Sequence, residues 1–154
     1  MKCNVDAALF KEQRAVGFGT VVRDSTGNFM VSKTCVTRGL FEVKEAEALA
    51  LLDAIHWTSS LELQDVIFET DSETVIKAIR TKNVDYTEFG SIISVCYQIL
   101  EAHPSFKVQH ARRQANMVTH TLAHTTISFA NLFITYHPPD IICKSINHDC
   151  GNND

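Results

Sequence analysis

The chain has 154 residues, of which 45% are apolar and 21% are charged. These values are ordinary for one soluble globular domain, and they exclude a collagen-like chain, a coiled coil and an intrinsically disordered chain. No apolar run approaches the roughly 18 residues that a membrane span needs, and the first residues lack the apolar segment of a secretory signal. Because the chain begins inside strand-like sequence, we expect it to be a piece of a longer parent, or to have lost upstream sequence.

The net charge is −4 and the sequence pI is about 5.9. A domain that binds nucleic acid through bulk positive charge would have a pI above about 9. Any nucleic-acid partner must therefore be held by a local patch or with the help of a metal ion. The five cysteines are odd in number and scattered, which indicates reduced intracellular thiols rather than a disulfide framework. We expect the cytoplasm or the nucleus as the compartment.

The first forty residues predict three strands, over 3–10, 16–23 and 29–37, because polar and apolar residues alternate in each. Short polar turns separate them, which is typical of an antiparallel meander. Gly17 and Gly19 lie on one face of the second strand. Glycines inside a strand mark close approach by a ligand or by another backbone.

The hydrophobic period then changes to that of a helix and alternates with short strands. Helices are predicted over 44–59, directly after Asp71-Ser72, over 88–102 and over 116–133, with strands over 65–70 and 106–110. This order predicts an α/β fold, in which a mixed five-stranded sheet is flanked by helices. Beyond residue 137 the sequence turns polar and irregular. We therefore expect one domain over 1–137 and a poorly ordered C-terminal tail over 138–154.

Three acids stand where a purely structural role would be costly. Asp6 interrupts an apolar strand, Glu47 lies in the first turns of a helix, and Asp71 follows a buried strand where a helix begins. Each has a structural reading of its own: a turn or edge-strand feature, a solvated helix charge, and an acid favoured by the helix dipole. If the first and fourth strands are neighbours, Asp6 and Asp71 face each other and the helix lays Glu47 over them.

Three converging carboxylates repel one another by kcal/mol unless a cation lies between them. Mg²⁺ takes oxygen ligands and keeps several waters, which suits a phosphate substrate. Two such ions about 4 Å apart activate a water and stabilise the leaving oxygen in phosphodiester hydrolysis. The three acids thus predict a metal-dependent phosphodiesterase.

The sequence resembles the ribonuclease H family, and more narrowly the plant reverse-transcriptase-like domains related to retrotransposon polyproteins. The residues that carry the resemblance are Lys-Cys-Asn-Val-Asp at 2–6, Gly-Phe-Gly-Thr-Val-Val-Arg-Asp at 17–24, Glu-Ala-Glu-Ala-Leu-Ala at 45–50, Glu-Thr-Asp-Ser at 69–72, and the stretch 110–123. The match is collinear over roughly 2–130. It implies strand order 3-2-1-4-5 with strand 2 antiparallel, and metal-dependent endonucleolytic cleavage of RNA in RNA/DNA hybrids.

By this resemblance Asp6, Glu47 and Asp71 match the first three metal-binding acids of the family. His110 matches a mobile-loop histidine that aids proton transfer or product release. The family's fourth acid is here His120, and a neutral imidazole suits Mn²⁺ or Zn²⁺ better than Mg²⁺. The site is then weakened, shifted toward Mn²⁺, or dead.

Candidate nucleic-acid contacts are Arg113 and Asn116, which match the family's Arg-x-x-Asn, and Ser72, whose helix N-terminus offers free backbone N–H groups. Simple capping is the alternative for Ser72. Ala7 stands where the family has Gly, which puts the fit to 2′-hydroxyls in doubt. The segment 83–104 holds no Lys or Arg, whereas bacterial relatives carry a basic helical handle there. Substrate must be gripped elsewhere.

Two functions follow. The first is an endonuclease that cuts the RNA strand of RNA/DNA hybrids with Mg²⁺ or Mn²⁺, using two ions if the site is intact. The alternative is a catalytically decayed module of the same fold, retained for binding nucleic acid or protein. A homodimer is a third arrangement to consider, although no feature of the sequence speaks strongly for it.

Overall fold

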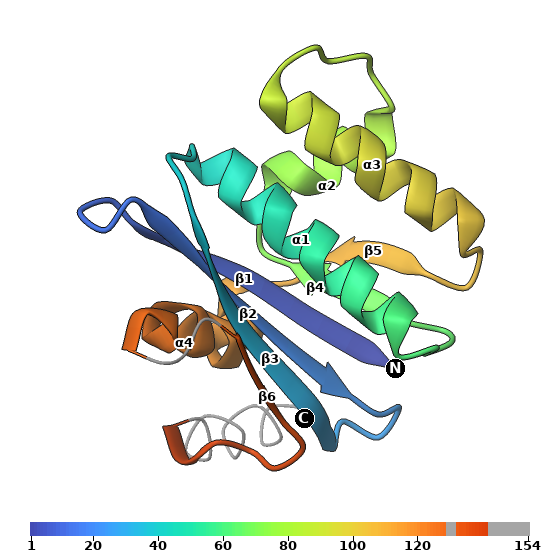
Figure 1. Cartoon of the computed structure of the whole chain (residues 1–154). Coiled ribbons are helices and arrows are strands. Elements are labelled where there is room, and N and C mark those ends of the chain that lie inside the picture. Colours follow the sequence, from blue (N-terminus) through green and yellow to red (C-terminus); the bar gives the residue numbers. More distant parts are fainter. Residues whose placement is uncertain (129–131, 142–154) are drawn as a thin grey trace.

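The computed structural model describes residues 1–128 and 132–141. Its centre is a six-stranded sheet in the order β5-β4-β1-β2-β3-β6 (Figure 1). The strands are β1 Lys2–Phe10, β2 Ala15–Arg23, β3 Phe29–Arg38, β4 Ile67–Thr70, β5 Lys107–His110 and β6 Leu132–Thr135. The helices are α1 Val43–Ser60, α2 Glu73–Thr81, α3 Glu88–Ala102 and α4 Met117–Thr125, with the 3₁₀ turns η1 Arg113–Asn116 and η2 Thr126–Ser128.

Strand pairing follows the chain order in the first half and crosses over in the second. β1, β2 and β3 are antiparallel neighbours, whereas β4 is parallel to β1, and β5 is parallel to β4. The predicted order 3-2-1-4-5 and the α/β class are therefore confirmed. The parallel pair β1–β4, with Asn4 opposite Glu69, places the carboxyl end of β4 beside the middle of β1. Open α/β sheets form their ligand crevices at the carboxyl ends of parallel strands.

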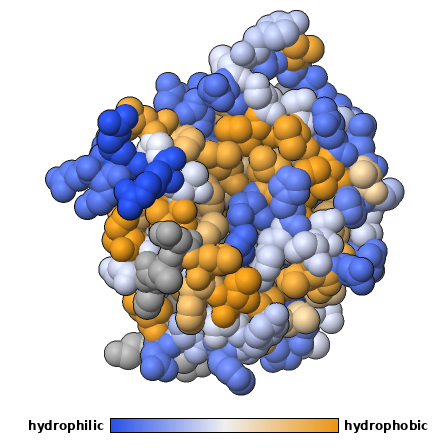
Figure 2. Space-filling view, in the orientation of Figure 1, coloured by the Kyte–Doolittle hydropathy of each residue, from blue (hydrophilic) through white to orange (hydrophobic). Residues whose placement is uncertain are grey.

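Helices cover both faces of the sheet. α1 packs against β1 and α3 against α1, while α4 lies on β1 and β2 from the other side (Figure 1). The larger core cluster joins β1, α1 and β4 through fully buried side chains, among them Val5, Leu51, Ile55 and Phe68. Figure 2 shows the α1 side, where strongly hydrophilic atoms gather at the β1–β2 hairpin, whose residues 11–14 are all exposed.

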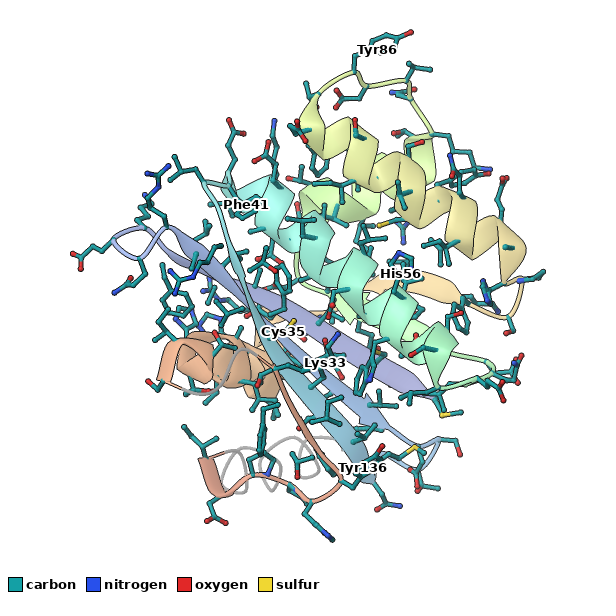
Figure 3. All side chains as sticks on the ribbon, viewed as in Figure 1. Lys33, Cys35, Phe41, His56, Tyr86 and Tyr136 are labelled. Carbon is teal, nitrogen blue, oxygen red and sulfur yellow. The ribbon has the colours of Figure 1, made fainter. Side chains whose placement is uncertain are left out.

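An ion pair adds to the packing between the sheet and α1. Lys33 projects from β3 toward α1 (Figure 3), where its Nζ lies 2.7 Å from Asp53 Oδ1. At the opposite extreme, Tyr86 extends from the loop between α2 and α3 and is 96% exposed (Figure 3). The Lys33–Asp53 ion pair thus joins β3 to α1, the helix that carries Glu47.

The two glycines of β2 permit α4 to lie directly on the strand backbone. A Cβ added at Gly17 would lie 2.7 Å from the Ala123 carbonyl oxygen, and one added at Gly19 would lie 2.8 Å from the Ala123 nitrogen. The close approach expected at these glycines is therefore that of another backbone, since α4 fills the space. It brings α4 within reach of Asp6, which is the register partner of Gly19.

The predicted helix over 116–133 is wrong in its second half. α4 ends at Thr125, η2 follows, and β6 pairs antiparallel with β3 as a sixth strand that was not expected. The Thr125 and Thr126 hydroxyls donate to the carbonyls of Leu122 and Ala123, and such local bonds compete with the helix. The run Leu-Phe-Ile-Thr also favours a strand.

No helix within residues 1–128 and 132–141 is long and apolar enough to cross a membrane. The tail predicted over 138–154 lies outside the described residues from 142 onward, and so do residues 129–131 of the helix predicted over 116–133. The domain boundary at 137 stays a prediction.

Candidate metal centre

Three elements bring the three acids together. Asp6 lies in β1, Glu47 lies in the second turn of α1, and Asp71 directly follows β4. Each acid offers an oxygen, and these oxygens all lie within 4.8 Å of one another. The convergence expected from neighbouring first and fourth strands is present. α1 begins one turn before Glu47, where the Glu45 carboxylate accepts from the Glu42 backbone N–H at 2.9 Å and fixes the helix start.

The acid cluster, defined as Asp6, Glu47 and Asp71, carries negative charge that protein groups do not fully compensate. Burial, followed by the charges of Asp6 and Asp71, raises the pKa of Glu47 to about 8 against an opposing effect of Arg113. Burial and the Asp71 charge raise the pKa of Asp6 to about 6, although the His120 hydrogen bond opposes them. Glu47 Oε2 is buried without a hydrogen-bond partner among the described residues. A buried orphan oxygen facing two more carboxylates fits a bound cation.

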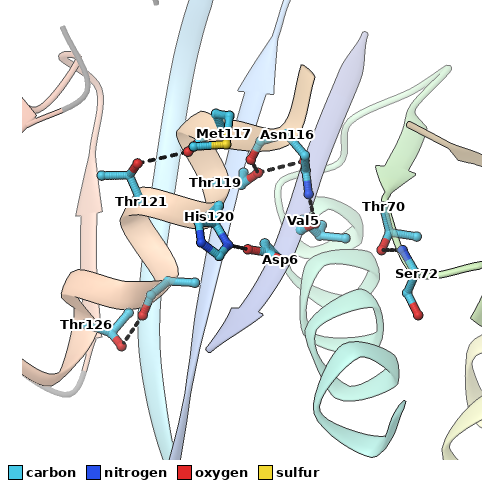
Figure 4. A network of polar contacts seen from close by, with 11 residues as sticks. Val5, Asp6, Thr70, Ser72, Asn116, Met117, Thr119, His120, Thr121 and Thr126 are labelled. Atoms are coloured by element: carbon cyan, nitrogen blue, oxygen red, sulfur yellow. Dashed lines mark hydrogen bonds and ion pairs between the residues drawn. The ribbon is translucent and has the colours of Figure 1, made fainter. Parts of the chain in front are cut away.

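His120 contacts this cluster through one acid only. Its Nδ1 donates to Asp6 Oδ2 at 2.8 Å, and the Asp6 side chain is 4% exposed (Figure 4). Among the described residues, the set of converging ligand atoms includes the three acids and not His120. The imidazole therefore occupies an acceptor position of Asp6. The family resemblance predicts that His120 stands where the family has an acid, but the sequence carried no signal for this hydrogen bond, which depends on how closely α4 packs on β2.

His124, one turn further along α4, lies beside His120 with ring centroids 4.3 Å apart and ring planes tilted by 57°. Burial, followed by the neighbouring charges of His120 and Arg113, lowers the pKa of His124. Its ring also meets Phe10 edge-on at 6.5 Å. These contacts place His124 in a small ring cluster on the surface of α4, and it is not part of the acid cluster.

His110 lies near the cluster but not in it. It ends β5 as the register partner of Thr70, and its side chain is exposed. It borders a shallow hollow of about 400 Å³ that α2 lines on the other side. Mobility or proton transfer at His110 stays a prediction.

The three predicted nucleic-acid contacts have different surroundings. Ser72 is the N-cap of α2, and its hydroxyl accepts from the Val75 N–H at 3.4 Å. Asn116 is buried, donates to the Val5 carbonyl at 2.8 Å and accepts from the Thr119 hydroxyl at 2.7 Å (Figure 4). Its side chain thus ties the start of α4 to β1. Arg113 is exposed, and its charge acts on Glu47, which places it beside the acid cluster.

Solved structures with the same fold include several ribonucleases H. The ribonuclease H1 of the halophilic archaeon Halobacterium salinarum NRC-1 superposes with a TM-score of 0.75 at 18% identity, over 84% of this chain and 98% of that one. LC11-RNase H1 in complex with an RNA/DNA hybrid gives 0.72 at 19% identity, over 82% and 96%. The protease–reverse transcriptase of prototype foamy virus gives 0.63 at 16% identity, over 84% of this chain and 21% of that one.

No curated protein matches the chain. A family model described as reverse transcriptase-like matches residues 4–126, which is most of the chain and includes all three acids and His120. The fold that this chain shares with the ribonucleases H agrees with that match. The chain therefore belongs to the reverse transcriptase-like family.

Proposed function

We propose that this protein is a divalent-metal-dependent endonuclease that hydrolyses the RNA strand of RNA/DNA hybrids. The observation that carries the proposal is the acid cluster, in which three carboxylates converge and a buried Glu47 oxygen has no protein partner among the described residues. Carboxylates in this state are a preformed site for a hard cation. The hybrid bound to LC11-RNase H1, a protein of the same fold, supports the choice of substrate.

Asp6, Glu47 and Asp71 would hold Mg²⁺ or Mn²⁺, and two ions if the site is intact. Divalent ions bound there supply an activated water and stabilise the leaving oxygen in phosphodiester hydrolysis. The chain's own part is to hold the three carboxyl groups oriented toward one another. His110, exposed at the end of β5, would give a proton from its imidazole to the leaving oxygen. Arg113, beside Glu47, would help to position a phosphate.

His120 sets the strength of the proposed site. Because its Nδ1 donates to Asp6 Oδ2, an ion that uses this oxygen must compete with the imidazole proton. A metal that tolerates nitrogen ligands is less affected than Mg²⁺. We therefore propose weak activity with Mg²⁺ and better activity with Mn²⁺.

The second candidate function is that of a decayed module, which keeps the fold for binding nucleic acid or protein but does not cut. The same 2.8 Å contact favours it, because His120 satisfies Asp6 in place of joining the acid cluster as a ligand. The plant and retrotransposon relationship, the intracellular compartment and the homodimer stay predictions.

The deciding experiment is cleavage of a labelled RNA/DNA hybrid with Mg²⁺ and, separately, with Mn²⁺. Asp71→Asn, purified in parallel, controls for contaminating nucleases. We expect internal cuts in the RNA strand that are stronger with Mn²⁺ and absent in the variant. Hybrid binding without cuts, in folded protein with either metal, would contradict the endonuclease and favour the decayed module.

A further inference from the structure

α2 presents a row of cations on its outer surface. Lys77 and Arg80 are exposed, and neither forms an ion pair with any described residue. Lys82 follows at the C-cap, where it contacts Tyr97 of α3. The segment 83–104, which includes α3, contains no Lys or Arg. The net charge of the chain is −4, yet the cations Lys77 and Arg80 of this helix are not neutralised by an ion pair with any described residue.

The cations border a concave surface. A hollow of about 400 Å³ lies between α2 and the end of β5, lined by Glu73, Ile76, Lys77, Arg80, Thr81 and His110. Lys77 and Arg80 stand on its α2 side and His110 on its β5 side, so basic groups flank the hollow on both sides, while Glu73 is the one acid in its lining and lies in the first turn of α2. Its neutral floor includes Ile76, which is 6% exposed. A shallow hollow flanked by basic groups fits a phosphate backbone better than it fits an apolar ligand.

The helix α2, which carries this row of cations, begins beside the acid cluster. Asp71 and the N-cap Ser72 immediately precede α2, so the helix axis leads away from the cluster. At 1.5 Å of rise per residue, Lys77 lies roughly 9 Å and Arg80 roughly 14 Å along the axis from Asp71. Successive phosphates of one duplex strand advance by about 3.4 Å along the duplex axis. For a duplex that runs along α2, the two cations are spaced to meet phosphates about three to four steps from one held at the cluster.

We propose that Lys77 and Arg80 form a phosphate-binding track that grips the backbone of the nucleic-acid duplex beyond the cut site. This inference rests on the proposed function and deepens it, because it says which surface holds the substrate that the metal centre cuts. Cations placed on the same side of the molecule as a dication site repel one another and the dication unless an anion bridges them. A polyanion that spans both meets this condition.

The test compares two variants that remove the same kind of charge at different places. Lys77→Gln/Arg80→Gln removes the track. Lys107→Gln is the control, because Lys107 is also exposed and forms no ion pair with a described residue, but begins β5 at the end of the sheet away from the acid cluster. Binding of a labelled RNA/DNA hybrid is measured by anisotropy over a range of KCl, with Ca²⁺ in place of Mg²⁺ and strand integrity checked on a gel. Cleavage with Mg²⁺ and Mn²⁺ is measured in parallel.

We expect the slope of log K against log salt to become shallower by about 0.9 for each phosphate that the protein no longer neutralises, hence by about 1.8 in the double variant. Lys107→Gln should keep the wild-type slope. Hybrids trimmed from one end to fewer than about four base pairs beyond the cut should bind the wild type more weakly. The same trimming should not weaken binding by the double variant, since it has no cation at those two positions.

If the wild type cuts the hybrid and the double variant keeps the wild-type salt slope, the phosphate-binding track is wrong, and the proposed endonuclease activity is unaffected. A slope that becomes shallower by about 0.9 in Lys107→Gln would also overturn it, because each removed charge would then have the same effect wherever it lies. A wild-type chain that neither binds nor cuts the hybrid would remove the proposed function, and the track with it. Both replaced side chains are exposed, and thermal unfolding of each variant confirms that it is folded.

Discussion

Two buried carboxylate sites lie on β1 and β4, and they are built in opposite ways. At one, Glu69 accepts from Asn4 Nδ2 at 3.0 Å and from Gln109 Nε2 at 2.7 Å, and it pairs with Lys2 Nζ at 3.1 Å. At the other, the Glu47 carboxylate faces two further acids and has a buried oxygen without a partner among the described residues. The Glu69 carboxylate thus finds its hydrogen-bond and ion-pair partners within the protein, while the Glu47 carboxylate lacks a partner for one oxygen among the described residues.

The difference separates a structural acid from a functional one. Glu69 is buried and one Glu47 oxygen is buried, so in both sites a negative charge needs compensation. The Glu69 site obtains it from two amides and an ammonium, and Arg23 Nη1 supports it by donating to Asn4 Oδ1 at 2.9 Å. The negative charge of the acid cluster is not compensated in this way, and this lowers the free energy of unfolding of the metal-free protein. A polar network that is satisfied specifies the fold, whereas one left incomplete indicates a ligand.

The largest effect should come from Asp71→Asn. Removing one carboxylate from the acid cluster leaves too few charged ligands, and we expect cleavage to fall by about 10³-fold or more, equivalent to roughly 4 kcal/mol. The free energy of unfolding of the metal-free protein should not fall, because a repulsive charge has been removed. Single-turnover cleavage and urea unfolding measure the two quantities. Cleavage that persists in this variant would disprove the three-carboxylate mechanism.

Glu69→Ala should have the reverse signature. It leaves Asn4 and Gln109 without their acceptor and Lys2 without its partner, so the free energy of unfolding should fall by about 3 kcal/mol. Any decrease in cleavage should follow the decrease in folded protein. Glu12→Ala, at the exposed β1–β2 hairpin, is the control and should change stability by less than about 0.5 kcal/mol. If Glu69→Ala instead became inactive while it stayed as stable as the wild type, the contrast between the two sites would be wrong.

The pH dependence of the free energy of unfolding should also distinguish the acid cluster from the Glu69 site. The raised pKa values of Glu47, about 8, and Asp6, about 6, mean that the folded protein binds more protons than the unfolded chain above about pH 4.5. The free energy of unfolding without metal should therefore fall as pH rises, by several kcal/mol between about pH 5 and pH 8, since each unit by which a pKa is raised is worth about 1.4 kcal/mol.

Glu47→Gln should make this fall less steep. In the wild-type protein, Mg²⁺ or Mn²⁺ should raise the free energy of unfolding more at about pH 8 than at pH 5, because binding requires ionised acids. Thermal unfolding across this range, with and without metal, measures both effects. A wild-type profile that stays level over the range would contradict unpaired charge at the acid cluster.

The first five strands and the placement of the three acids at strand and helix ends could be predicted from the sequence, because alternation, turns and strand ends are local signals. The sheet order 3-2-1-4-5 came from the family resemblance instead. β6 could not be predicted in this way. Phe129 and Phe133 are four residues apart and continue the helical stripe of Val118 and Leu122. The position of Phe133 is decided by its pairing with Thr34 of β3, a contact between residues that are far apart in the chain.

The contact between His120 and Asp6 could not be predicted for a similar reason. It depends on α4 resting on Gly17 and Gly19, and the glycines alone are equally consistent with a ligand beside β2. The charge row on α2 also lacked a sequence signal, because Lys77 and Arg80 are typical of a solvated helix face. Only the hollow beside His110 and the start of α2 at the acid cluster distinguish that row.

The smallest effect, and the sharpest test of why the acid cluster is incomplete, is His120→Asp. The substitution removes the imidazole that donates to Asp6 and adds an oxygen ligand, which Mg²⁺ prefers to nitrogen. Cleavage with Mg²⁺ should rise by about tenfold, or roughly 1.4 kcal/mol, and the preference for Mn²⁺ should shrink. His124→Asp, one turn along α4 and outside the cluster, is the matched control and should give no increase. Equal increases in the two variants would mean that added negative charge, and not a fourth ligand, produces the effect. No increase in His120→Asp would mean that the imidazole is not what limits the site, and the weakness would then have to lie in how the substrate is held.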